Sequence, residues 1–281
     1  SLNALFPWQS GSWPTDWPAT IQQKWNAVLN RLPHRRGAAH AQPEDTTVIN
    51  FDTVGAENTW NQNAHDFSAQ HIEELTSMLQ LCQENGTRLL LISAPKTTLD
   101  VVSYETYFDD YAYFKQLAAQ YGASYYDFNL AKPELFENKE PDYHKDFTHM
   151  NAAGGHAFSL SMAKFLAMLD AGQDVESLFE TPSEYLVAVN YITNVYLTPE
   201  VHPDKILLLA GSYHGPSVQA EYEFWVKAPG ESEYSRVSAY STRSWTEDSA
   251  AEHGTYQFRV NARIVGSSAD FERYYDCSVD F

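Results

Sequence analysis

The stretch TRLLLISAP, residues 87–95, decides the fold class of the first half of this 281-residue chain. Its apolar run from Leu89 to Ile92 has no polar residue facing either side, as in a strand that is covered on both faces of a parallel sheet. Helical patterns precede and follow it at 68–86 and 104–122, and each ends at a glycine. The sequence therefore predicts strands that alternate with helices in this part of the chain.

Two further strands continue the alternation. TTVINF at 46–51 is the predicted first strand, and ASYYDFN at 123–129 is the predicted third. Residues 46–175 are expected to form an α/β domain in which a parallel, flavodoxin-like sheet lies in three layers with helices on both faces. Residues 1–45, which are rich in Trp and Pro, are expected to form an irregular segment with one helix.

The last helix of this domain is predicted at 151–169. Asn151 is expected to cap it, and Gly154 and Gly155 allow its first turn to pack closely. Its inward face is the apolar set Phe158, Met162, Phe165 and Leu169, at spacings of four, three and four.

After this helix the hydrophobic period changes to that of strands. Residues 171–184 are polar and are predicted to be a linker. Beyond it, 220–234 and 254–263 alternate apolar and polar residues, which is typical of half-buried antiparallel strands.

The spacing from Glu252 to Tyr256, acid-x-Gly-x-Tyr, is typical of a tyrosine corner. In such a corner the phenol bonds back to the backbone at a turn between two strands. Residues 185–281 are therefore predicted to form an all-β sandwich of fibronectin or immunoglobulin type.

Composition restricts the partners. With 37 acidic and 18 basic residues the net charge is −19, so we expect no nucleic-acid partner. The high Tyr and Trp contents, 18 and 7, together with this acidity, favour an exported protein, extracellular or at the cell surface, that handles carbohydrate. The chain does not begin with Met, which leaves room for a signal or a membrane anchor upstream of Ser1. Cys82 and Cys277 are too few for a disulfide framework.

The stretch DYHKDFTHMN, 142–151, carries the candidate catalytic residues. Asp146 and His149 lie on the loop between a predicted strand and the last helix, and catalytic loops of α/β sheets lie at the carboxyl ends of strands. A His that acts as general base needs a carboxylate to fix its tautomer and stabilise its imidazolium. A metal ion held by His144, Asp146 and His149 is the alternative, but the spacing fits no established zinc motif and no metal is expected. His156 is expected on the helix surface.

The stretches YGASYYDFNL and DFTHMNAAGGHAFS resemble the closing segment of SGNH or GDSL-type hydrolases. In that family an Asp-x-x-His motif on the last loop carries two members of a Ser-His-Asp triad, and Asp146 and His149 match it position by position. The upstream helix and strand look like those of members similar to teichoic-acid D-alanylation and polysaccharide O-acetylation proteins. The resemblance covers residues 46–170 and implies ester hydrolysis or acyl transfer without a metal or organic cofactor.

The resemblance also implies a nucleophilic Ser in a Gly-Asp-Ser-like turn after the first strand, with oxyanion donors beside it. Ser10 and Ser12 follow no predicted strand. Ser212, in ILLLAGSYHG, follows a strand pattern, but two sandwich strands joined by a glycine turn are the preferred interpretation there. The nucleophile therefore stays unassigned and the α/β domain is expected to be incomplete. The chain alone is expected to turn over small acetyl esters slowly or not at all.

Aromatic residues supply candidate glycan contacts. Trp60 and Asn63, after the predicted first strand, could meet a sugar face and an oxyanion, and packing of Trp60 under the loop is the alternative. Trp225 and Trp245 could form a carbohydrate platform or cover the sheets. The sequence thus favours an exported SGNH-like serine esterase or O-acyltransferase that acts on acyl esters of cell-surface or dietary polysaccharide. The alternative is a non-catalytic surface protein that binds glycans through a degenerate SGNH-like domain.

Overall fold

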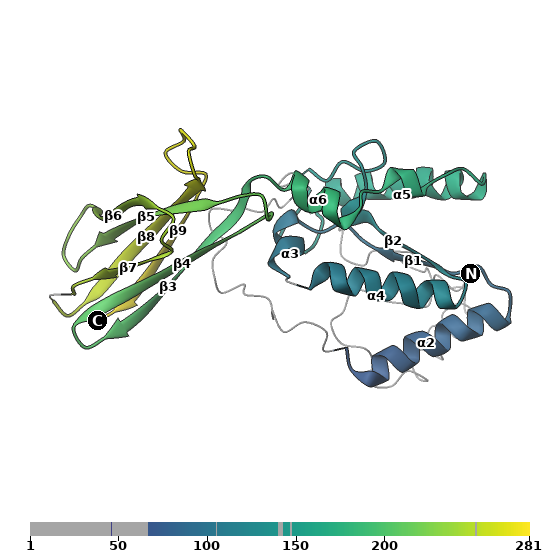
Figure 1. Cartoon of the computed structure of the whole chain (residues 1–281), viewed down its shortest axis with the longest axis horizontal. Coiled ribbons are helices and arrows are strands. Elements are labelled where there is room, and N and C mark those ends of the chain that lie inside the picture. The colour runs from purple at the N-terminus through teal and green to yellow at the C-terminus, as the bar shows by residue number, and fades with distance from the viewer. Residues whose placement is uncertain (1–45, 47–66, 105, 140–142, 147, 251) are drawn as a thin grey trace.

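The computed structural model describes residues 46, 67–104, 106–139, 143–146, 148–250 and 252–281. In these residues an α/β region precedes a region of antiparallel strands (Figure 1). This order agrees with the change of hydrophobic period in the sequence. The predicted segment 1–45 and, apart from residue 46, the predicted first strand lie outside the described residues.

The α/β region is built on two parallel strands, β1 (Leu90–Ser93) and β2 (Ser124–Asp127). Three longer helices and one short helix lie around them: α2 (Ala69–Glu84), α3 (Thr98–Ser103), α4 (Tyr107–Gln120) and α5 (Ala152–Asp170). All of these except α3 were predicted. None of the helices in the described part of the chain combines the length and the apolarity needed to cross a bilayer.

Successive side chains of β2 face different helices. The ring of Tyr125 packs against Tyr111 and Phe114 of α4, whereas Tyr126 packs against Phe165 of α5. Helices therefore cover both faces of the β1–β2 pair, which confirms the α/β class. The described residues contain only these two parallel strands, so the predicted three-layer parallel sheet is not shown.

Helix α5 is positioned as its sequence pattern predicts. Asn151 caps it, because its side chain accepts a hydrogen bond from the Gly154 N–H. A Cβ atom at Gly154 would lie 2.5 Å from the carbonyl oxygen of Tyr143, so close packing requires glycine there. The predicted inward residues all join the core of the α/β region: Phe158, Met162, Phe165 and Leu169.

The prediction of a polar linker at 171–184 was wrong. Val175 is buried, and Leu178 and Phe179 pack on the same core as α5, because these apolar residues face inward between acidic ones. The segment contains the 3-10 helix η5 (Glu176–Leu178), and α6 (Pro182–Ala188) follows it.

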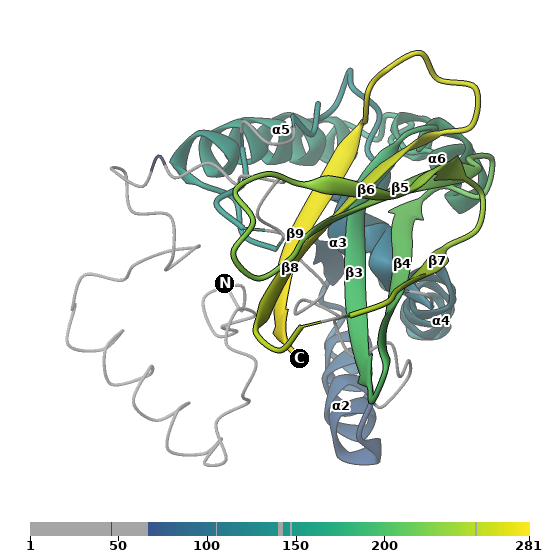
Figure 2. The same ribbon diagram turned by 90° about the vertical axis from the view of Figure 1, so that its left-hand side faces the viewer.

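The C-terminal region contains two antiparallel sheets (Figure 2). One has the order β3–β4–β7 and the other β6–β5–β8–β9. The bounds of the strands are β3 (Ile192–His202), β4 (Lys205–His214), β5 (Ala220–Lys227), β6 (Ser235–Ser241), β7 (Trp245–Asp248), β8 (Thr255–Ile264) and β9 (Arg273–Asp280).

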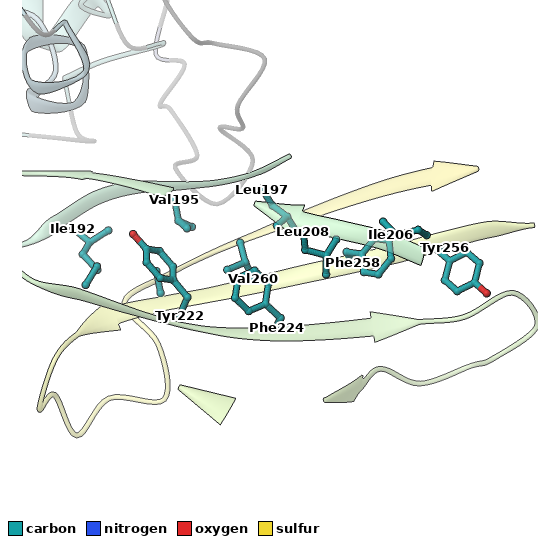
Figure 3. Packing of buried hydrophobic residues seen from close by; sticks show 12 residues of the cluster. Ile192, Val195, Leu197, Ile206, Leu208, Tyr222, Phe224, Tyr256, Phe258 and Val260 are labelled. Carbon is teal, nitrogen blue, oxygen red and sulfur yellow. The ribbon is translucent and has the colours of Figure 1, made fainter. Parts of the chain in front are cut away.

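The two sheets share one apolar core (Figure 3). Tyr222 and Phe224 of β5 and Phe258 and Val260 of β8 enter it opposite Leu208 of β4. The residues between them in sequence face outward, so the predicted alternation is confirmed.

The predicted tyrosine corner is also present. The buried phenol of Tyr256 donates a hydrogen bond to the Glu252 carbonyl oxygen at 3.0 Å and accepts one from the Glu252 N–H at 3.3 Å. This pair of bonds fixes the turn before β8.

The two regions meet beside the start of β3. Helix α3 contacts β3 and β4, and Gly215 donates its N–H to the Val189 carbonyl oxygen at 3.1 Å. A Cβ atom at Gly215 would lie 2.3 Å from that oxygen, so only glycine fits. Because α3 follows β1 directly, the β region is attached near the carboxyl end of that strand.

Candidate functional site

Residues 143–151, here called the dyad loop, lead into α5. The loop is closed by two backbone hydrogen bonds, from the Asn151 N–H to the Tyr143 carbonyl oxygen at 2.7 Å and from the Lys145 N–H to the His149 carbonyl oxygen at 3.1 Å. These bonds place Asp146 and His149 at the tip of the loop.

Asp146 and His149 form the predicted contact. Nδ1 of His149 lies 3.0 Å from Oδ2 of Asp146 and 3.2 Å from Oδ1. Oδ1 also accepts hydrogen bonds from the backbone N–H groups of Thr148, at 2.8 Å, and His149, at 2.6 Å. Both side chains are partly open to solvent, with 45% of Asp146 and 44% of His149 exposed.

The electrostatics keep Asp146 ionised. Burial alone would raise the pKa of its carboxyl, but the backbone N–H groups of Thr148 and His149, together with the His149 ring, outweigh burial and lower that pKa below its usual range. An ionised Asp146 accepts a hydrogen bond from Nδ1–H of His149. The lone pair of the ring is then on Nε2, which is the tautomer that a general base requires.

The hydroxyl of Thr148 contacts Nδ1 of His149, the same ring nitrogen that faces Asp146. Its Oγ1 lies 2.8 Å from Nδ1 of His149 and donates to Oδ1 of Asp146 at 3.2 Å. In a triad the nucleophile faces the other ring nitrogen. Thr148 therefore helps to hold the ring and does not occupy the place of a nucleophile.

A second charged pair lies at the same edge. Lys96, three residues after β1, pairs with Asp100 in the first turn of α3, with Nζ 2.7 Å from Oδ2. Burial raises the pKa of the Asp100 carboxyl, and Lys96 opposes that rise. The charges of Asp146 and His149 also influence the pKa of Asp100. Loops after both parallel strands thus contribute charged groups, as expected for the carboxyl edge of such a sheet.

A buried network of hydrogen bonds supports the carboxyl edge of the two parallel strands. Asn129 follows β2 and donates from Nδ2 to Oδ1 of Asp127 at 2.8 Å and to the Tyr107 hydroxyl at 2.7 Å. The Tyr107 hydroxyl in turn donates to Oδ2 of Asp127 at 2.8 Å. Burial raises the pKa of Asp127, whose carboxylate is held by these neutral donors. We assign Asp127 a structural role.

His144 does not share a site with the dyad. Its side chain is fully buried, whereas His149 is at the exposed tip of the loop. Burial lowers the pKa of His144 to about 4, so the ring is neutral at neutral pH. Among the residues that the structure describes, no group of three His, Cys, Asp or Glu side chains could hold a metal ion.

The remaining candidates fall in three places. Trp60 and Asn63 lie outside the described residues, as do Ser10 and Ser12. His156 is exposed on α5, as predicted. Ser212 lies in β4 and its Oγ forms a 2.8 Å hydrogen bond with the Tyr222 hydroxyl in the β region, which confirms the interpretation of its stretch as strand.

Trp225 and Trp245 do not form a common platform. Trp225 belongs to β5, and its Nε1 donates to the buried carboxylate of Glu223 at 2.9 Å, so it covers the outer face of the four-stranded sheet. Trp245 belongs to β7 of the other sheet and is 42% exposed, with the guanidinium of Arg243 4.5 Å from its ring centre.

Four residues at this edge were not predicted from the sequence: Lys96, Asp100, Asn129 and Asn138, whose amide bonds to the carbonyl oxygen of Lys96 and to the ring of His144. A usable signal was present for two of them. Lys96 and Asn129 are polar residues placed just after an apolar strand, in SAPK and DFN, where the carboxyl edge of a parallel sheet collects functional groups. Asp100 and Asn138 carry no such signal.

A scan against models of protein families finds no match, and a search of curated proteins finds no similar sequence. The likeness to SGNH hydrolases therefore depends on the Asp-x-x-His motif and on its place after β2 and before α5.

Proposed function

We propose that this chain is an exported SGNH-like serine esterase or O-acyltransferase acting on acyl esters of a cell-surface or dietary polysaccharide. The observation that carries the proposal is the 3.0 Å contact between Nδ1 of His149 and Oδ2 of Asp146. It is supported by the position of this contact at the carboxyl edge of β1 and β2.

In this proposal His149 is the general base. Nε2 removes the proton from a serine hydroxyl while the serine oxygen attacks the ester carbonyl, and the same proton then passes to the departing sugar hydroxyl. Asp146 stays ionised throughout, holds the ring and stabilises the imidazolium. A water molecule or an acceptor hydroxyl then takes the acyl group from the serine. No metal or organic cofactor enters these steps.

We also infer the finer fold assignments on the same basis. Helices on both faces of β1 and β2 support an SGNH-like three-layer sheet of which these strands form part. Two sheets of three and four strands around one core, together with the Tyr256 corner, support a fibronectin- or immunoglobulin-like sandwich.

Acetate release from an acetylated polysaccharide, such as acetylated xylan, tests the proposal. We expect slow release by the unmodified chain and none by His149→Ala, with binding of the glycan retained in affinity electrophoresis. His156→Ala, an exposed histidine on α5, is the matched control and should leave release unchanged.

The same experiment separates the rival function. Binding of the glycan by the folded chain without any acetate release, and without any effect of His149→Ala, would favour a non-catalytic glycan-binding protein. Release that is independent of His149 would also contradict the proposed mechanism.

A further inference from the structure

The base of the dyad loop contains a buried histidine with a specific hydrogen bond. His144 pairs with Met150 in an isolated bridge, directly below the tip that carries Asp146 and His149. Nε2 of His144 lies 2.9 Å from Oδ1 of Asn138. The orientation of the dyad therefore depends on how this base is held.

Asn138 links His144 to the loop that follows β1. Its Nδ2 donates to the carbonyl oxygen of Lys96 at 2.6 Å, which leaves Oδ1 to face His144. Nε2 of His144 must then carry the proton, because an amide oxygen only accepts. The neutral ring that burial enforces, through a pKa lowered to about 4, matches this role as a single donor.

The hydrogen bond distinguishes His144 from a residue that only fills space. Nδ1 of His144 is buried and has no hydrogen-bond partner among the described residues. A buried acceptor without a donor is unfavourable, and an apolar side chain of similar size would avoid that cost. The bond from Nε2 to Asn138 is thus the property that an apolar residue could not supply.

Lys96, where this link ends, is also held from the other side. Its backbone N–H donates to Oδ1 of Asn129 at 2.7 Å, and its side chain pairs with Asp100, on which the charges of the dyad act. The two hydrogen bonds that connect His144, Asn138 and Lys96 therefore join the dyad loop to the loop after β1.

We propose that His144 and Asn138 are positioning residues for the dyad: they lock the dyad loop to the main chain of Lys96 and so hold the ring of His149 in the Nδ1–H tautomer. This inference rests on the proposed function, because it assigns the two residues to the general base of that reaction.

The tautomer of His149 can be read directly from the ¹⁵N chemical shifts of its ring nitrogens by NMR at a pH where the ring is neutral. We expect the Nδ1–H form in the unmodified chain and its loss in Asp146→Asn. His144→Leu should shift the ring toward the values of Asp146→Asn, and His144→Gln, whose amide can donate to Asn138, should restore it. His156→Leu is the control for the same substitution at an exposed position and should change nothing.

The outcomes separate the two hypotheses without any turnover. An unmodified chain in which His149 is not in the Nδ1–H form contradicts the proposed function. A chain that has this form and keeps it in folded His144→Leu contradicts the positioning role alone. If His144→Leu does not fold, Asn138→Ala breaks the same link from its other end and is judged by the same shifts.

Discussion

Two polar clusters in this molecule each pair a carboxylate with a basic side chain, but in different surroundings. On the outer face of the four-stranded sheet, Arg259 donates to both carboxylate oxygens of Asp276, from Nε and Nη2, each at 2.7 Å. Its guanidinium also lies between the rings of Tyr234 and Tyr274, at 5.2 and 4.5 Å from their centres. At the tip of the dyad loop, by contrast, an ionised carboxylate orients a half-exposed imidazole.

This difference indicates which of the two clusters is suited to catalysis. In the outer-sheet cluster the Arg259 guanidinium is matched by the Asp276 carboxylate and covered by two aromatic rings, so its charge is neutralised within the protein. In the dyad the carboxylate holds Nδ1 of the His149 ring, and imidazole is the side chain most often used as a general base. Substitutions in the two clusters should therefore affect different measurements.

The largest expected difference is in ester cleavage. His149→Ala should reduce the slow cleavage of an acetyl ester to the uncatalysed background, and Asp146→Asn should lower it less, because the base is indispensable and its orienting partner is partly replaceable. Arg259→Met should leave the rate unchanged. Initial rates of the three variants and the unmodified chain, at equal folded fraction by circular dichroism, check this. An equal loss in Arg259→Met would show that the outer-sheet cluster also takes part.

The next effect concerns stability in acid. The pKa of His144 is lowered by burial to about 4, so between pH 6.5 and 4 the unfolded chain binds a proton that the folded chain does not. The free energy of unfolding should fall across this window, as the pH drops, by on the order of 3 kcal/mol, the equivalent of the pKa difference. Urea denaturation at several pH values measures it. His144→Leu should remove this contribution, and pH profiles of the two proteins that run parallel would contradict the assignment.

A smaller loss is expected in the β region. Tyr256→Phe removes the hydroxyl of the tyrosine corner and leaves the backbone groups of Glu252 without their partner, so the free energy of unfolding should fall by about 1–2 kcal/mol. Tyr113→Phe, at an exposed position on α4, is the matched control and should change it by less than about 0.5 kcal/mol. Equal effects in urea denaturation would show that the corner contributes no specific stability.

The smallest stability effect is expected within the outer-sheet cluster. Arg259 and Asp276 are partly exposed, and solvent screens their attraction, so Arg259→Met should cost about 1 kcal/mol or less. Measuring the free energy of unfolding by urea denaturation in low and in high salt separates the contribution of the charge from that of packing on Tyr234 and Tyr274. A loss of several kcal/mol would mean that this cluster resembles a buried network more than a surface pair.

Local patterns explain what the sequence could predict. The alternation that places Tyr222 and Phe224 inward depends only on the period of a strand, and the Asp146–His149 contact spans only three positions. Both were therefore predictable. The tyrosine corner likewise joins residues four apart.

Long-range contacts and a misleading composition explain the features that were not predicted from the sequence. The bond from Asn138 to Lys96 joins residues 42 apart, and no period in the sequence indicates it. The segment 171–184 was interpreted as a linker because polar residues dominate its composition, although Val175, Leu178 and Phe179 pack it against the core beside α5. Neither the contribution of Asn138 nor the burial of that segment follows from secondary-structure propensity.

The most direct test of the central claim, that Asp146 and His149 activate a serine, is covalent trapping. The chain is incubated with p-nitrophenyl acetate, quenched in acid and examined by intact and peptide mass spectrometry, which detects an acyl-enzyme even when turnover is slow. We expect one acetyl group on a serine outside the β region in the unmodified chain, and none in His149→Ala. A folded chain that is never acetylated, that is acetylated equally in His149→Ala, or that carries the acetyl group on Ser212 would contradict it.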